Sequence, residues 1–167
     1  MIIYHPRNDI YHCMFRFITI AKLQNLEGFE FSRLRIYDFL FLFPHFIKDV
    51  SFPRAKGMTA LKKDAEKIAP AYERLPDRKR LFSEMGDYHI QALQILEAKG
   101  IFKEVDGIIR ISDSFQSSSV TNLFEDNQYI NNKFYKTLLK TLNNVKLSGD
   151  NGLKQRTGLM EYRYDAI

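Results

Sequence analysis

The chain has 167 residues, enough for one domain with its own hydrophobic core and too few for several. Hydrophobic residues make up 45% and charged residues 27%, which is typical of a folded globular protein and excludes a generally disordered chain. A single Cys excludes a disulfide framework within the chain, and the segment after Met1 has a charge and a proline where a signal peptide is apolar. We therefore expect a cytoplasmic protein.

The formal net charge is +5, and the whole excess lies between Lys48 and Arg80, where ten Lys or Arg accompany five Asp or Glu. A basic stretch of this kind can be a solvated helix face, a contact for phosphates or a docking site for an acidic protein surface. The sequence leaves these alternatives open. The candidate contacts for nucleic acid or for an acidic partner are Lys62, Lys63, Arg78, Lys79 and Arg80.

The first predicted element is an amphipathic helix from about residue 10 to Leu23. Either Asn8 or Asp9 can cap its N-terminus. Apolar side chains recur at helical spacing along one face, at Ile10, Met14, Phe17, Ile18 and Ala21.

The segment Phe29 to Ile47, FEFSRLRIYDFLFLFPHFI, is the richest in aromatic residues. It predicts a short extended piece, then a helix capped by Ser32 that stops or kinks before Pro44. The apolar run is far shorter than the ~20 residues of a membrane span, so we expect no membrane contact. Most of these side chains are expected in the core, and the rest are candidates for a protein interface: Phe29, Phe31, Phe39, Phe43 and Phe46.

Residues 52 to 59 are predicted to form a loop or linker, and a weaker helix follows from Leu61 to Tyr72. Asp77 is placed to cap the next helix, and Gly86 and Asp87 are expected to form a turn.

A second helix is predicted from about Tyr88 to Lys99, with Gly100 in the left-handed position after its end. The dipeptide Asp106 and Gly107 predicts a hairpin turn. Helix, tight turn, helix and hairpin follow one another in the order of a winged helix.

The serine-rich segment after Ser112 reads as a flexible connector. A further helix is expected from residue 120 or 121 to about Val145, followed by a tail that orders only against the rest of the domain or a partner. The predicted fold class is mainly α: a small helical domain with a winged-helix-like unit and one β-hairpin. Its parts are residues 1–52, 60–112 and 120–167, together forming one compact domain.

Side chains capable of catalysis do not form a recognisable constellation. His12 and Cys13 are adjacent, so on a helix they diverge by about 100° and do not pair as base and nucleophile. No phosphate-binding glycine motif is present. The other candidates for metal binding lack the spacing of a structural zinc site. These candidates are His5, His45, His89, Asp9, Asp38 and Asp87. We therefore expect no metal, no cofactor and no enzyme activity.

Sequence-specific DNA reading is also weakly supported. In a winged helix the second helix enters the major groove, and here it would present two glutamines suited to adenine edges. Only one cation accompanies them, with Glu97 unfavourable beside phosphates. The side chains on that helix are His89, Gln91, Gln94, Glu97 and Lys99.

Two segments carry a family resemblance. YHPRNDIYHCMFRF, at Tyr4 to Phe17, and LRIYDFLFLFPHFIKDV, at Leu34 to Val50, resemble the middle component of bacterial ABC-three-component systems, the group that includes Lamassu-type defence systems. The resemblance implies a small non-catalytic subunit that accompanies an SMC or Rad50-like ATPase and an effector, often a nuclease, in defence against phages and plasmids. It implies no catalytic residues.

The function expected from the residues and the resemblance together is a scaffold that holds the effector on the ATPase, with double-stranded DNA contacted through the complex. The alternative is a stand-alone winged-helix DNA-binding regulator, and a third option is a nuclease or hydrolase with an unrecognised site. A gene for a long coiled-coil ATPase next to this one favours the scaffold, whereas an isolated gene beside a divergent promoter favours the regulator.

Overall fold

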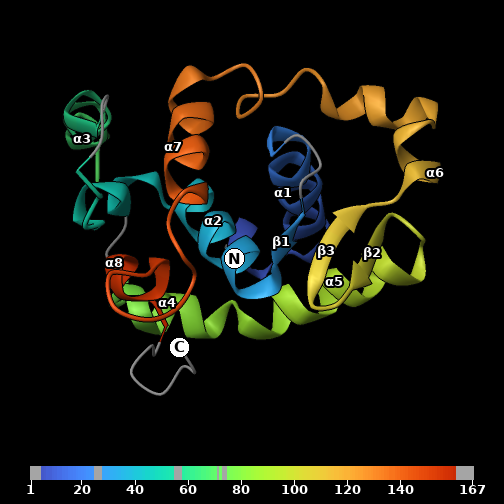
Figure 1. The fold of residues 1–167 in the computed structure, drawn as a ribbon, viewed down its shortest axis with the longest axis horizontal. Helices are drawn as coiled ribbons and strands as arrows, with labels where there is room; N and C mark the ends of the chain where they lie inside the picture. Colours follow the sequence, from blue (N-terminus) through green and yellow to red (C-terminus); the bar gives the residue numbers. More distant parts are fainter. Residues whose placement is uncertain (1–4, 25–27, 55–57, 71, 73–74, 161–167) are drawn as a thin grey trace.

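A computed structural model describes residues 5–24, 28–54, 58–70, 72 and 75–160. Helices make up most of the fold, and a small sheet lies at one side (Figure 1). The elements in chain order are η1 (Pro6–Asn8), α1 (Ile10–Leu23), β1 (Phe29–Glu30), α2 (Phe31–Leu42), η2 (Pro44–Asp49), α3 (Met58–Glu66), α4 (Arg78–Glu84), α5 (Gly86–Ala98), β2 (Phe102–Val105), β3 (Ile108–Ile111), α6 (Asp113–Gln116), η3 (Ser119–Phe124), α7 (Lys133–Asn143) and α8 (Leu153–Thr157). The predicted mainly α class is confirmed.

Helix α1 confirms the predicted bounds. The Asp9 side chain accepts a hydrogen bond from the His12 backbone N–H at 3.0 Å, which satisfies one of the free donors of the first turn. The buried side of α1 packs on α5 and α2.

Helix α2 begins two residues earlier than expected. Its N-cap is Glu30, whose backbone is still extended because β1 pairs there, so the prediction of Ser32 as the cap is wrong. The end is as predicted, since α2 stops at Leu42 and Pro44 opens η2.

The sheet joins two distant parts of the chain. Its strand order is β1-β3-β2, with both pairs antiparallel and Phe29 opposite Ile109. The hairpin turn is confirmed, because Asp106 and Gly107 both have positive φ (53° and 77°). Gly28, with φ of 82°, lets β1 approach β3: a Cβ there would lie 2.6 Å from Ile108 Cγ2.

Helices α4 and α5 follow each other without the expected turn. Asp77 caps α4 as predicted. Met85 has near-helical dihedrals (φ −77°, ψ −10°), so α5 already begins at Gly86 and the predicted turn at Gly86 and Asp87 is wrong. At its other end Gly100 has φ of 66°, and the Ile101 N–H donates to the Leu96 carbonyl, as a glycine-terminated helix end requires.

The segment after Ser112 differs from the prediction. It is not an unstructured connector: the Ser112 side chain caps α6, and Phe115 is buried. The long helix expected from residue 120 is also wrong. Asn127 accepts hydrogen bonds from two backbone N–H groups in a turn, and Asn132 caps α7, so the helix begins only at Lys133.

The helix expected from Leu61 to Tyr72 is shorter than predicted, and part of the tail is ordered against the domain. Helix α3 begins at Met58 and ends at Glu66, and Tyr72 is exposed instead of lying on its apolar face. In the tail, α8 packs through Leu153, with Leu159 buried after it. Tyr162 and Tyr164 of the tail lie outside the described residues.

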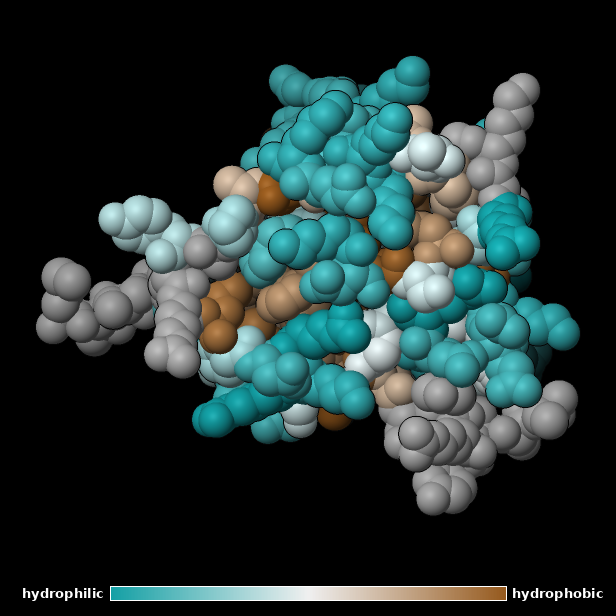
Figure 2. All heavy atoms as spheres, turned by 90° about the vertical axis from the view of Figure 1, so that its left-hand side faces the viewer, coloured by the Kyte–Doolittle hydropathy of each residue, from teal (hydrophilic) through white to brown (hydrophobic). Residues whose placement is uncertain are grey.

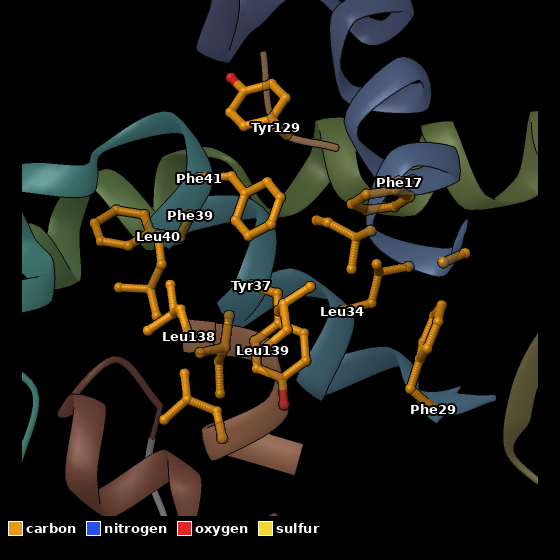
Figure 3. Close-up of a cluster of buried hydrophobic side chains, with 14 of the residues drawn as sticks. Phe17, Phe29, Leu34, Tyr37, Phe39, Leu40, Phe41, Tyr129, Leu138 and Leu139 are labelled. Carbon is orange, nitrogen blue, oxygen red and sulfur yellow. The ribbon is translucent and has the colours of Figure 1, made fainter. Parts of the chain in front are cut away.

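The core is one cluster that takes side chains from all three predicted parts. Figure 3 shows Phe17 of α1, the α2 side chains Tyr37, Phe39 and Phe41, and Leu138 of α7 in the same interior. Arg33 of α2 also donates to the carbonyls of Leu142 and Val145 at the end of α7, at 3.0 and 2.9 Å. Helix α2 is therefore central to the packing.

The predicted winged-helix-like unit, residues 60–112, packs against elements outside its own range. The hairpin takes β1 as its third strand, and the most extensive helix packing of α5 is on α1. Both partners come from residues 1–52.

Among the helices of the described residues, none combines the length and apolarity needed to cross a membrane.

Candidate functional site

Three helices meet at a buried cluster of ionisable side chains. Arg16 of α1 donates two hydrogen bonds to Asp38 of α2, from Nε to Oδ1 at 2.7 Å and from Nη2 to Oδ2 at 3.0 Å. His89 of α5 places Nε2 3.0 Å from the same Oδ2. The exposed fractions of Arg16, Asp38 and His89 are 2%, 0% and 0%. We call this the Arg16–Asp38–His89 cluster.

The hydrogen bonds define the charges of the cluster. Arg35 donates from Nε to His89 Nδ1 at 3.3 Å, so the remaining proton of a neutral imidazole lies on Nε2 and is donated to Asp38. Burial lowers the pKa of His89, although the Asp38 carboxylate opposes this. Burial alone would raise the pKa of Asp38, but the Arg16 guanidinium and the His89 bond lower it below its ordinary value. The cluster is thus an ion pair with a neutral histidine.

The same cluster does not fit a metal ion or a nucleophile. Ligand atoms of Cys13, Asp38 and His89 lie within 4.8 Å of one another. However, both Asp38 oxygens already accept hydrogen bonds from Arg16, whose charge would repel a bound cation. Burial raises the pKa of the Cys13 thiol, and the Asp38 charge raises it further. The cluster connects α1, α2 and α5 instead.

Sequence reasoning missed this cluster because its members are far apart in the chain. The sequence presents Asp38 only as a candidate metal ligand, whereas its partners in the structure are Arg16 and His89. The available signal was a charge inside an apolar run: Asp38 stands between Tyr37 and Phe39. A charge at such a position requires a buried counter-charge.

The structure separates the predicted interface aromatics into two groups. Phe29, Phe39 and Phe43 are core side chains, with exposed fractions of 3%, 0% and 9%. The Phe39 ring packs against Phe43, Phe46 and Phe82 at centroid distances of 5.2 to 5.8 Å. These three predicted contacts are therefore corrected to core residues. Phe31 and Phe46 are only partly buried and keep some surface for a partner.

The predicted basic contacts also divide into two groups. Lys62 and Lys63 are exposed on α3, whereas Lys79, Arg80 and the half-buried Arg78 lie on α4. Figure 1 shows α3 and α4 at opposite ends of one side of the molecule. Arg80 is held by Glu84, one turn on, at 2.9 Å. Among the described residues, the predicted basic contacts therefore lie on two separate helices.

The α3 lysines border a groove of about 620 Å³, which we call the α3 groove. Figure 2 shows the side of the molecule on which α3 lies, where hydrophobic residues emerge between hydrophilic ones. The residues that line the groove are Val50, Ser51, Phe52, Pro53, Arg54, Met58, Thr59, Lys62, Lys63 and Glu66.

Fold and sites together define a small, mainly helical protein whose ionisable cluster is sealed in the core and whose accessible features include a basic groove and partly exposed aromatics. The chain belongs to the family described as ABC-three component (ABC-3C) system Middle Component 5, which it matches over residues 2–165. The resemblance of its N-terminal segments is thereby confirmed, and the match extends through the part after Ser112. No curated protein and no solved structure matches the chain.

Proposed function

We propose that this protein is a non-catalytic scaffold that links an SMC or Rad50-like ATPase to an effector, a nuclease, in a bacterial anti-phage or anti-plasmid defence complex of the Lamassu type. The family match over residues 2–165 carries the proposal, because a middle component of a three-component system works with partner proteins. The buried Arg16–Asp38–His89 cluster supports the non-catalytic role, since its ionisable groups are sealed from substrate. We place the complex in the cytoplasm.

The direct test is co-expression of the tagged protein with the products of the adjacent genes. The proposal expects an ATPase with long coiled coils and an effector to co-purify with it. A protein that elutes as a monomer in the presence of both gene products contradicts the scaffold role.

Double-stranded DNA is proposed to be contacted through the assembled complex, with Arg78, Lys79 and Arg80 taking part. Lys79 is exposed on α4, so a phosphate can reach its ammonium group. Reversal of all three to Glu should lower the DNA affinity of the complex and reduce its salt slope by about 0.9 per lost phosphate contact. DNA affinity that is unchanged at low salt would exclude this contact.

We also propose that the winged-helix-like part is made from α1, β1, α2, α5 and the hairpin. The strand order β1-β3-β2 and the packing of α5 on α1 support this arrangement. The stand-alone regulator gains less support from it. Helix α5 contains no Lys or Arg, and His89, expected on its DNA-facing side, is buried.

A further inference from the structure

The α3 groove has an apolar floor between basic side chains. Val50 and Met58 form buried parts of it, with exposed fractions of 5% and 8%, and Phe52 and Pro53 are half-buried beside them. The unbranched Met58 side chain adapts to the shape of inserted apolar groups, and Phe52 adds a rigid apolar ring. The floor is therefore suited to apolar groups from outside the chain.

Positive charge dominates the rim. Arg54, Lys62 and Lys63 are exposed there, and Glu66 is the single acid among the described lining residues. Within the part of the chain that the structure describes, no ion pair involves these three cations, whereas Lys67 on the same helix pairs with Asp64 at 2.9 Å. The rim thus carries a net positive charge next to an apolar surface.

One wall of the groove is fixed before any partner arrives. The Ser51 N–H donates to the Arg156 carbonyl, and Arg156 Nη1 donates to the Ser51 carbonyl, both at 2.9 Å. These two bonds tie the strand-like segment after η2 to α8. A preformed groove loses less conformational entropy when a partner binds.

We propose that the α3 groove binds an acidic, amphipathic segment of a partner protein, with apolar side chains on Val50, Phe52 and Met58 and carboxylates against Lys62 and Lys63. The combination of floor and rim selects a protein over DNA. Phosphates need cations but gain nothing from an apolar floor, whereas an amphipathic peptide uses both. This inference rests on the proposed scaffold role and identifies one of its contacts.

The test uses the same co-purification with the ATPase and the effector. Three variants are compared with the wild type: Lys62→Glu with Lys63→Glu at the rim, Phe52→Ser at the floor, and Lys99→Glu with Lys103→Glu as a matched control. The control changes two exposed lysines at the far end of the molecule, near the hairpin. Circular dichroism and thermal unfolding of each variant establish that it is folded.

We expect the rim and floor variants each to reduce recovery of one partner subunit at least tenfold, and the control to leave recovery unchanged. If the wild type retains both partners and the rim variant does too, the groove proposal is overturned while the scaffold role stands. If the rim variant keeps its partners but the complex loses DNA affinity, the groove contacts nucleic acid and the proposal is wrong. If the wild type retains no partner, both proposals fail.

Discussion

At the scale of single residues, the most consequential pair is Arg16 and Asp38. Each is a charge enclosed in a core of aromatic and aliphatic side chains, so neither is tolerated without the other. The two residues are 22 positions apart in the sequence, and their pairing joins α1 to α2. Changes here should therefore affect folding far more than changes to surface ion pairs.

Asp38→Asn keeps the shape of the side chain but removes its charge. The Arg16 guanidinium would remain buried without a counter-charge, and we expect the free energy of unfolding to fall by about 3–5 kcal/mol. Urea denaturation measures this change. Asp64→Asn is the control, because its partner Lys67 is exposed and such pairs contribute about 0–1 kcal/mol. A loss below 1 kcal/mol for Asp38→Asn would show that the buried pair does not hold the core.

The neutral state of His89 predicts a pH dependence of stability. The unfolded chain binds a proton at His89 near the ordinary pKa of about 6.5, whereas burial lowers the pKa of His89 in the folded chain. The unfolded state thus holds more protons just below pH 6.5, and the free energy of unfolding should decrease as the pH falls. Asp38, whose pKa is also lowered, adds a further decrease in more acidic solution.

Denaturation series between pH 7 and pH 5 check this expectation. His89→Gln should show a flatter dependence on pH than the wild type. Equal slopes for wild type and His89→Gln would contradict a neutral buried His89.

At the scale of elements, the sequence predicted the helix caps, the helix ends and the hairpin turn that neighbouring residues determine. The Asp9 and Asp77 caps, the end of α2 before Pro44 and the Asp106 and Gly107 hairpin all follow from residues within a few positions. The two-residue strand β1 was not predictable as a sheet strand, because its pairing with β3 depends on a partner about 80 residues away. The prediction of one helix across residues 120 to 145 is wrong, because the Asn127 and Asn132 side chains accept hydrogen bonds from backbone N–H groups that a continuous helix would use.

Gly28→Ala tests the pairing of β1 with β3. The added Cβ would be 2.6 Å from Ile108 Cγ2 and 2.7 Å from Arg110 Cγ, on top of the strain of a φ near 82°. Gly149→Ala is the matched control, since its φ is 79° and a Cβ there would meet nothing within 4 Å. Backbone strain costs of order 1–3 kcal/mol in both variants, and the steric clash is added only at Gly28.

We expect a larger drop in the free energy of unfolding for Gly28→Ala, with faster amide exchange in β3. If the two alanine variants lose the same stability, β1 does not pack closely on β3.

At the scale of the whole molecule, the sequence could not separate core from interface in the segment from Phe29 to Ile47. Aromatic density shows only that the side chains need cover, and the cover can come from the same chain or from another. Here α7 supplies much of the cover through Leu138 and Leu139. The position of α7 depends on the whole fold. The buried cluster escaped prediction for the same reason, since Arg16 and His89 are 73 positions apart in the numbering of the chain.

The scaffold role makes a claim about dependence as well as binding: the effector should be held on the ATPase only when this protein is present. Affinity purification of a tagged effector, from cells that express the ATPase with and without this chain, measures that dependence. The account predicts that the ATPase is recovered with the effector when the chain is present and is lost when it is omitted. Equal recovery of the ATPase in both samples would contradict the proposed function.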